Sequence, residues 1–205
     1  MGNVVELKDY YTNELKDWQT RYGYTKPKEK LKIYYDPTVY ASTIQLVKVH
    51  PVEIGWNMVV LPYKDGYKVW DILVYPQKVS AAYISVDLPR WGLWKASLDN
   101  KTEAAINGHG HSHVNMSPFA SVVDENQQHD EILTKNNGFY FFQIWNKRNE
   151  VNSFFYDIDN RIYYEKEDID IIVEDVDTFV EESFRMVAGE TRRKPMEAGE
   201  DFESE

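Results

Sequence analysis

The sequence predicts an α/β fold in which a mixed β-sheet is flanked by a few helices. Short runs rich in aromatic and β-branched residues, typical of strands, separate stretches whose apolar residues recur every three or four positions, as in amphipathic helices. The chain has 205 residues, which is enough for one domain with its own hydrophobic core. Apolar residues make up 42% of it, so we expect the middle of the chain to be globular.

The first 30 residues are predicted to form an N-terminal helix and a linker. Apolar residues spaced three and four apart indicate an amphipathic helix over residues 4–22, which Gly23 ends. The charged segment Lys26–Lys30 then forms the linker. Such a helix serves more often for docking or packing than for catalysis.

The main domain is predicted to span residues 31–188, and it opens with a short strand over Leu31–Tyr35. Asp36 and Pro37 favour a helix start, because Asp caps helices and Pro suits the first helical position. The following run, Val39–Val49, fits a helix, although its β-branched residues leave a strand open.

The remaining elements follow from alternation, helical spacing and turn residues, with Asp65-Gly66 as a hairpin signal. The expected strands cover residues 53–61, 67–75, 79–86, 102–110, 139–145, 151–158, 162–164 and 169–173, and the expected helices cover 88–98, 124–135 and 176–187. An acidic tail over 189–205 is predicted to be disordered.

The charge balance narrows the range of possible functions. With 34 acidic against 23 basic residues, the net charge of −11 argues against a general nucleic-acid binder, which needs a basic surface. Protein partners or basic segments fit this balance better. No apolar run is long enough to span a membrane, and the first residues lack the apolar core of a secretory signal, so we expect a cytoplasmic protein. The chain has no cysteine and therefore no disulfide.

Three histidines lie close together, at positions 109, 111 and 113, and Asp124 follows at the start of a predicted helix. Residues two apart on a strand point to the same face, so His111 and His113 aim their imidazoles the same way. Asp124 could then close the site from the next element. Two imidazoles and a carboxylate suit zinc and leave a fourth position open, as in catalytic zinc sites. On residue types alone, His109 is also a candidate ligand.

An open metal site favours hydrolysis, which also needs a general base and a hydroxyl group that can donate to the developing oxyanion. The residues alone leave several candidates for both roles. The candidate bases are Glu53, Glu103, Glu125 and Glu131, and the candidate hydroxyls are Ser112, Ser117 and Ser121.

The motif His111-Ser112-His113, seven residues, then Ser121-Val122-Val123-Asp124 resembles the signature of the JAMM metalloisopeptidases, the catalytic MPN-plus branch of the MPN domain family. Its five fixed positions over 14 residues make it specific. Glu53-Ile54-Gly55 resembles the family's upstream glutamate, which lies just after the first helix. The resemblance covers roughly residues 31–165.

The resemblance implies an MPN-like, cytidine-deaminase-like fold with one zinc ion per chain, held by His111, His113 and Asp124. Glu53 would deprotonate the attacking water and pass the proton to the leaving amine. Ser121 would stabilise the oxyanion. The implied substrates are peptide or isopeptide bonds, often at the C-terminus of ubiquitin or a ubiquitin-like protein.

The chain departs from the family pattern at two positions. His109 stands where the family commonly has tryptophan, and Val114 where it commonly has proline. Neither change removes a ligand, but both bear on the substrate groove. We therefore expect His109 to line the groove or stand behind the ligands. Ser112, between the two ligands, is expected to face away and orient the loop.

Simpler interpretations remain. His111 and His113 could be exposed strand residues, while Asp124 and Ser121 could merely cap a helix. One rival function is a non-catalytic MPN-type scaffold or assembly protein, although that branch usually lacks ligand residues that this chain keeps. A barrel amidohydrolase would need a longer chain with a βα repeat. A metallo-β-lactamase type would need further His and Asp ligands close behind the pair.

Overall fold

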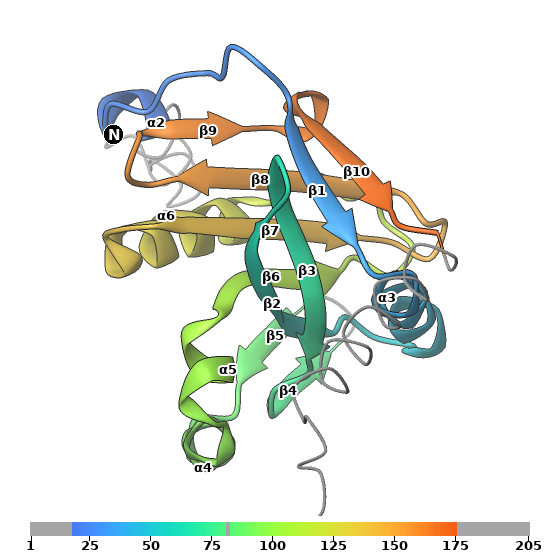
Figure 1. Ribbon diagram of the computed structural model, residues 1–205. Helices are drawn as coiled ribbons and strands as arrows, with labels where there is room; N and C mark the ends of the chain where they lie inside the picture. The colour runs from blue at the N-terminus through green and yellow to red at the C-terminus, as the bar shows by residue number, and fades with distance from the viewer. Residues whose placement is uncertain (1–17, 81–82, 176–205) are drawn as a thin grey trace, which may run out of the picture. The chain divides into compact units, whose positions relative to one another are not determined.

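The computed structural model describes residues 18–80 and 83–175 (Figure 1). By its contacts the chain divides into two units, residues 1–173 and 174–205, and every helix and strand named here belongs to the first. Of the helix expected over 4–22, one turn, α2 (Trp18–Arg21), is described, and the earlier part lies outside the described residues. The helix expected over 176–187 and the tail also lie outside them.

Eight strands form one mixed sheet, so the prediction of a mixed sheet flanked by helices is confirmed. Their order is β10-β1-β3-β2-β6-β7-β8-β9. The pairs β1–β10, β1–β3 and β6–β7 are parallel, and the other pairs are antiparallel. The strands are β1 (Leu31–Tyr35), β2 (Gly55–Tyr63), β3 (Gly66–Leu73), β6 (Ile106–Ser112), β7 (Phe139–Trp145), β8 (Val151–Asp157), β9 (Ile162–Tyr164) and β10 (Ile169–Val173).

The sheet curves strongly and almost closes on itself around an apolar core (Figure 1). The ring of Tyr67 on β3 lies 4.3 Å from that of Phe139 on β7 and 4.7 Å from that of Phe155 on β8, measured between centroids. These strands are not neighbours in the sheet, so the contacts require the curvature. Trp56 and Met58, on β2, are fully buried in this core.

Helix α3 (Pro37–Val49) packs on the same core through Val47, which settles the open choice between helix and strand. Its start follows the sequence signal: the Asp36 carboxylate accepts a hydrogen bond from the Thr38 N–H at 2.8 Å, and Pro37 is the first helical residue. Helix α6 (Val122–Lys135) belongs to a second apolar cluster, in which Ile132 packs with aromatic residues of α2, β7 and β8.

Two predicted strands are wrong in part. The first third of the strand expected over 102–110 belongs to helix α5 (Asn100–Ala104), because the Asp99 carboxylate caps this helix by accepting hydrogen bonds from the N–H groups of Lys101 and Thr102. The strand expected over 79–86 is two strands, β4 (Gln77–Ser80) and β5 (Tyr83–Val86), paired in a separate hairpin. Apolar alternation over eight residues does not distinguish one strand from two short ones.

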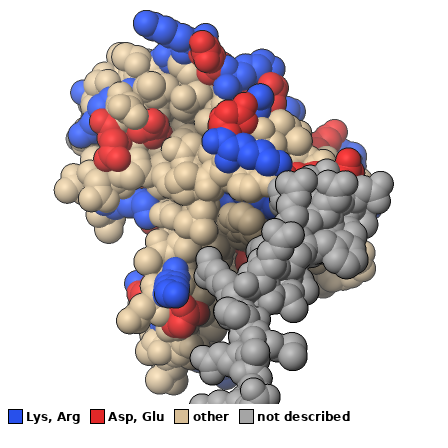
Figure 2. Space-filling model, in the orientation of Figure 1, with Lys and Arg blue, Asp and Glu red and all other residues tan. Residues whose placement is uncertain are grey.

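Helix α4 (Leu88–Ser97) matches its prediction closely, and a short 3-10 helix, η1 (Lys166–Asp168), precedes β10. Among the described residues, no helix is long and apolar enough to cross a membrane. On the face shown in Figure 2, basic and acidic side chains are interspersed. Some charged side chains form ion pairs on the surface, such as Lys30 with Asp170 at 2.9 Å.

Candidate metal centre

Antiparallel pairing of β2 with β6 brings Glu53 to the histidines. Gly55 lies opposite His111, and continuing this register by two residues places position 53 beside position 113. Just before the start of β2, the Ser112 N–H donates to the Ile54 carbonyl at 2.9 Å, and the Ile54 N–H donates to Ser112 Oγ at 3.1 Å. Ser112 therefore fixes the backbone immediately after Glu53.

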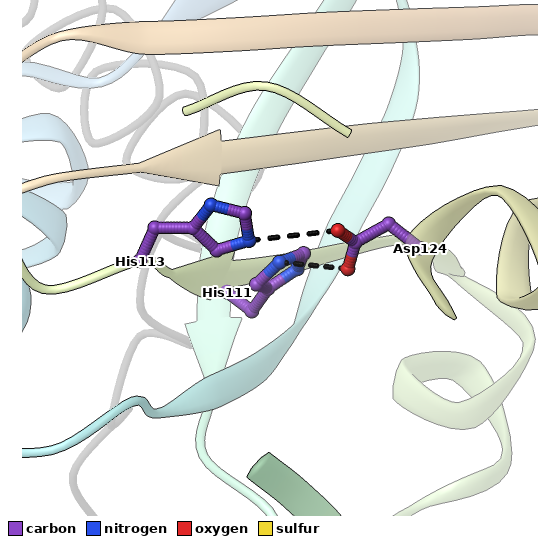
Figure 3. A group of neighbouring side chains, drawn as sticks. All are labelled: His111, His113 and Asp124. Carbon is purple, nitrogen blue, oxygen red and sulfur yellow. Dashed lines mark ion pairs between the residues drawn. The ribbon is translucent and has the colours of Figure 1, made fainter. Parts of the chain in front are cut away.

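His111, His113 and Asp124 form a buried group whose potential ligand atoms all lie within 4.8 Å of one another (Figure 3). His111 Nε2 is 3.0 Å from Asp124 Oδ1, and His113 Nε2 is 3.5 Å from Asp124 Oδ2. The histidines come from β6 and the residue after it, and the aspartate comes from the first turn of α6. Among the described residues, this is the one group of three or more such side chains close enough to share a metal ion.

The orientation of both imidazoles suits a cation between them. His111 Nε2 is buried and makes no hydrogen bond, although Asp124 Oδ1 is 3.0 Å away. His113 Nδ1 lies 3.1 Å from the Ser117 carbonyl oxygen, which can only accept, so this nitrogen carries the proton. In the neutral ring, His113 Nε2 then has its lone pair on the side of Asp124, as binding to a metal ion requires. Metal-binding histidines commonly have such a second partner, so the donor set fits zinc.

Asp124 is fixed by the start of its helix. Ser121 is the N-cap of α6: its N–H and hydroxyl donate to Asp124 Oδ2 at 2.7 and 2.6 Å, while the Asp124 N–H donates to Ser121 Oγ at 3.3 Å. Burial raises the pKa of Asp124, but the two imidazoles and the Ser121 hydroxyl outweigh burial and hold the pKa well below its usual range. The carboxylate is therefore ionised and ready to bind a cation.

Glu53 lines a cavity of about 420 Å³ together with the metal group and Ser121. Its side chain is buried, and burial raises its pKa, partly opposed by His113 and His111. A pKa shifted towards neutrality suits a general base. Of the four candidate glutamates, only Glu53 lines this cavity, and of the three candidate serines, only Ser121 does.

His109 lies in the same cavity but is not part of the metal group. Its Nε2 is 3.0 Å from the Tyr75 hydroxyl and its Nδ1 is 3.3 Å from the Gln127 amide nitrogen, so both ring nitrogens have protein partners. Burial and the neighbouring His111 lower the pKa of His109 to about 3, so its ring stays neutral.

Comparison with known proteins assigns neither a family nor a function to this chain. No family model matches the sequence, and no curated protein matches it. One similar solved structure is the solution structure of protein DSY2949 from Desulfitobacterium hafniense, which is 16% identical in sequence. The match covers 70% of this chain and 93% of that chain, with a TM-score of 0.44. A similarity this weak supports no argument about fold or function.

The two partners of His109 were not among the site residues predicted from the sequence. Gln127 follows Asp124 by three residues, so the two share a helix face, and helical spacing could have identified it. Tyr75 follows β3, and no local pattern links it to the histidines. Its hydroxyl approaches because Gly55 has no side chain: a Cβ there would lie 2.4 Å from the hydroxyl oxygen.

Proposed function

We propose that this protein is a zinc-dependent hydrolase that cleaves peptide or isopeptide bonds, with the C-terminus of a ubiquitin-like or other small protein as its substrate. The observation that carries the proposal is the buried group of His111, His113 and Asp124 beside Glu53 in one cavity. The JAMM-like motif is formed by these same residues, and an MPN-like fold is part of the same proposal.

The ligand roles follow from the donor atoms. Nε2 of His111, Nε2 of His113 and the Asp124 carboxylate would hold one zinc ion, because these atoms face one another and the first of them has no other partner. Bound zinc would polarise the scissile carbonyl and make a water molecule more acidic. Ser121 holds the Asp124 carboxylate in place through its N–H and hydroxyl.

The proton transfers fall to Glu53. Its carboxylate accepts a proton from the attacking water and then delivers that proton to the leaving amine nitrogen. Ser121 is the one candidate hydroxyl in the cavity, and it would turn from Asp124 Oδ2 to donate to the oxyanion. The hydrogen bond to Asp124 Oδ2 and the bond to the oxyanion would therefore use the same hydroxyl proton, whereas in the helix cap Ser121 Oγ accepts from the Asp124 N–H.

The test compares wild type with Glu53→Gln on a panel of fusions that carry ubiquitin-like C-terminal segments. We expect Glu53→Gln to retain one zinc ion per chain and to lose cleavage by a factor on the order of 10² or more, the contribution of a general base. Glu103→Gln is the matched control, because Glu103 lies outside the cavity and pairs with Lys95 at 3.2 Å. Cleavage retained by Glu53→Gln would exclude Glu53 as the base.

A further inference from the structure

The cavity that contains the metal group has two chemically different parts. Its most buried lining consists largely of polar and ionisable side chains, among them Glu53 and the metal group. The more exposed part of its lining is mainly apolar. The apolar residues that line the cavity are Ile84, Val86, Met116, Phe119 and Val123.

Four of these apolar side chains are unusually open to solvent. Val86 is 39% exposed, Met116 48%, Phe119 57% and Val123 67%. Apolar side chains scattered singly on a surface need no explanation, but several around one cavity are typical of a binding site. They lie on two separate segments, β5 and the segment that runs from β6 into the first turn of α6.

The apolar lining begins directly at a metal-ligand residue. The ring of Phe119 packs edge-on against the imidazole of His113, with 5.9 Å between ring centroids. A group bound against Phe119 therefore lies next to the reacting centre. At the buried part of the cavity, Tyr75 is held by His109 and is itself almost fully buried.

We infer that the cavity binds an extended polypeptide segment that has an apolar side chain next to the scissile bond, and that Phe119 and Val123 select this side chain. The inference rests on the proposed function and names its substrate class. A peptide amide matches the polar lining, and a leucine-like side chain matches the exposed apolar lining, which would become buried on binding. Phe119 and Val123 thus determine specificity and take no part in the chemistry.

The direct test is binding, measured with the zinc-loaded Glu53→Gln protein so that no cleavage occurs. Two short fluorescein-labelled peptides are compared by fluorescence anisotropy; they are identical except that one central leucine in the first is asparagine in the second. We expect the leucine peptide to bind about tenfold more tightly, which is what burial of one apolar side chain supplies. Equal binding of the two peptides, or binding of neither, would overturn the inference.

Substitutions test whether Phe119 and Val123 contact the leucine side chain of the peptide. Phe119→Ser and Val123→Ser, made in the same Glu53→Gln background, should each remove most of the preference for leucine while zinc content stays unchanged. Leu133→Ser is the matched control, because Leu133 is also an exposed apolar residue of α6 but does not line the cavity. Phe119→Leu should keep the preference. A loss in Leu133→Ser as large as in Val123→Ser would contradict the assignment.

Cleavage by wild type separates this inference from the proposed function. If wild type cleaves both peptides with equal kcat/KM, the proposed function stands and the inference fails. If the leucine peptide binds selectively but wild type cleaves neither peptide nor the fusion panel, binding by this surface stands and the hydrolase function fails.

Discussion

Ser112→Ala removes the hydroxyl oxygen that accepts a hydrogen bond from the Ile54 N–H, at the place where the end of β6 lies beside the residue before β2. Ser112 is 1% exposed and Ile54 4%, so water cannot readily replace the lost acceptor. A buried donor without a partner costs about 1–3 kcal/mol. A chain of this length changes its melting temperature by roughly 2–4 °C per kcal/mol, so we expect a decrease of about 2–12 °C.

The same bond positions the residue before Ile54, which is Glu53. We therefore expect Ser112→Ala to cleave more slowly while its zinc content stays at the wild-type level, because the three metal ligands keep their own contacts. Calorimetry, zinc analysis and a cleavage assay on the same preparation would measure the three effects. Ser117→Ala is the control: its side chain is exposed, and its backbone carbonyl continues to hold His113. An unchanged melting temperature for Ser112→Ala would refute the reasoning.

Two further predictions concern the surroundings of the site. Gly55→Ala should lower the free energy of unfolding by about 1–3 kcal/mol, because the new Cβ would lie 2.4 Å from the Tyr75 hydroxyl oxygen and displace it from His109; urea denaturation that gives the wild-type value would contradict this. In zinc-free protein, Asp124 has a lowered pKa, so its stabilising contribution is present above the ordinary Asp pKa of about 4 and is lost as the pH falls below it. Asp124→Asn should flatten this part of the stability profile, and an equally steep acid loss in the variant would place the cause elsewhere.

Much of the fold could be predicted because its signals are local. Asp36 and Pro37 mark the start of α3, and Asp65-Gly66 marks the β2–β3 hairpin. The errors arose where a local signal was ambiguous. The Asp99 cap starts a short helix inside a segment that otherwise fits a strand, and an eight-residue apolar run divides into β4 and β5.

Some residues of the site could likewise be predicted from local signals, whereas others depend on contacts between distant parts of the chain. His111 and His113 could be assigned from strand spacing, and Asp124 from its place at a helix start. The position of Glu53 depends on the register between β2 and β6, which spacing alone does not determine. In the sequence, only the family resemblance distinguished Glu53 from the other three candidate bases. Tyr75 reaches His109 through a tertiary contact, for which the sequence carries no periodic signal.

The central claim is that His111, His113 and Asp124 bind one zinc ion. Its most direct test is the zinc content of the purified protein, measured by inductively coupled plasma mass spectrometry after dialysis against trace zinc. We expect one zinc ion per chain in wild type and in His50→Ala, a control histidine outside the metal group, and much less in His111→Ala and Asp124→Asn. Removal of the metal with a chelator should also lower the melting temperature, because a ligand that binds only the folded state stabilises it. Wild-type protein that binds no zinc, or ligand variants that bind as much as wild type, would contradict the account and favour a non-catalytic scaffold.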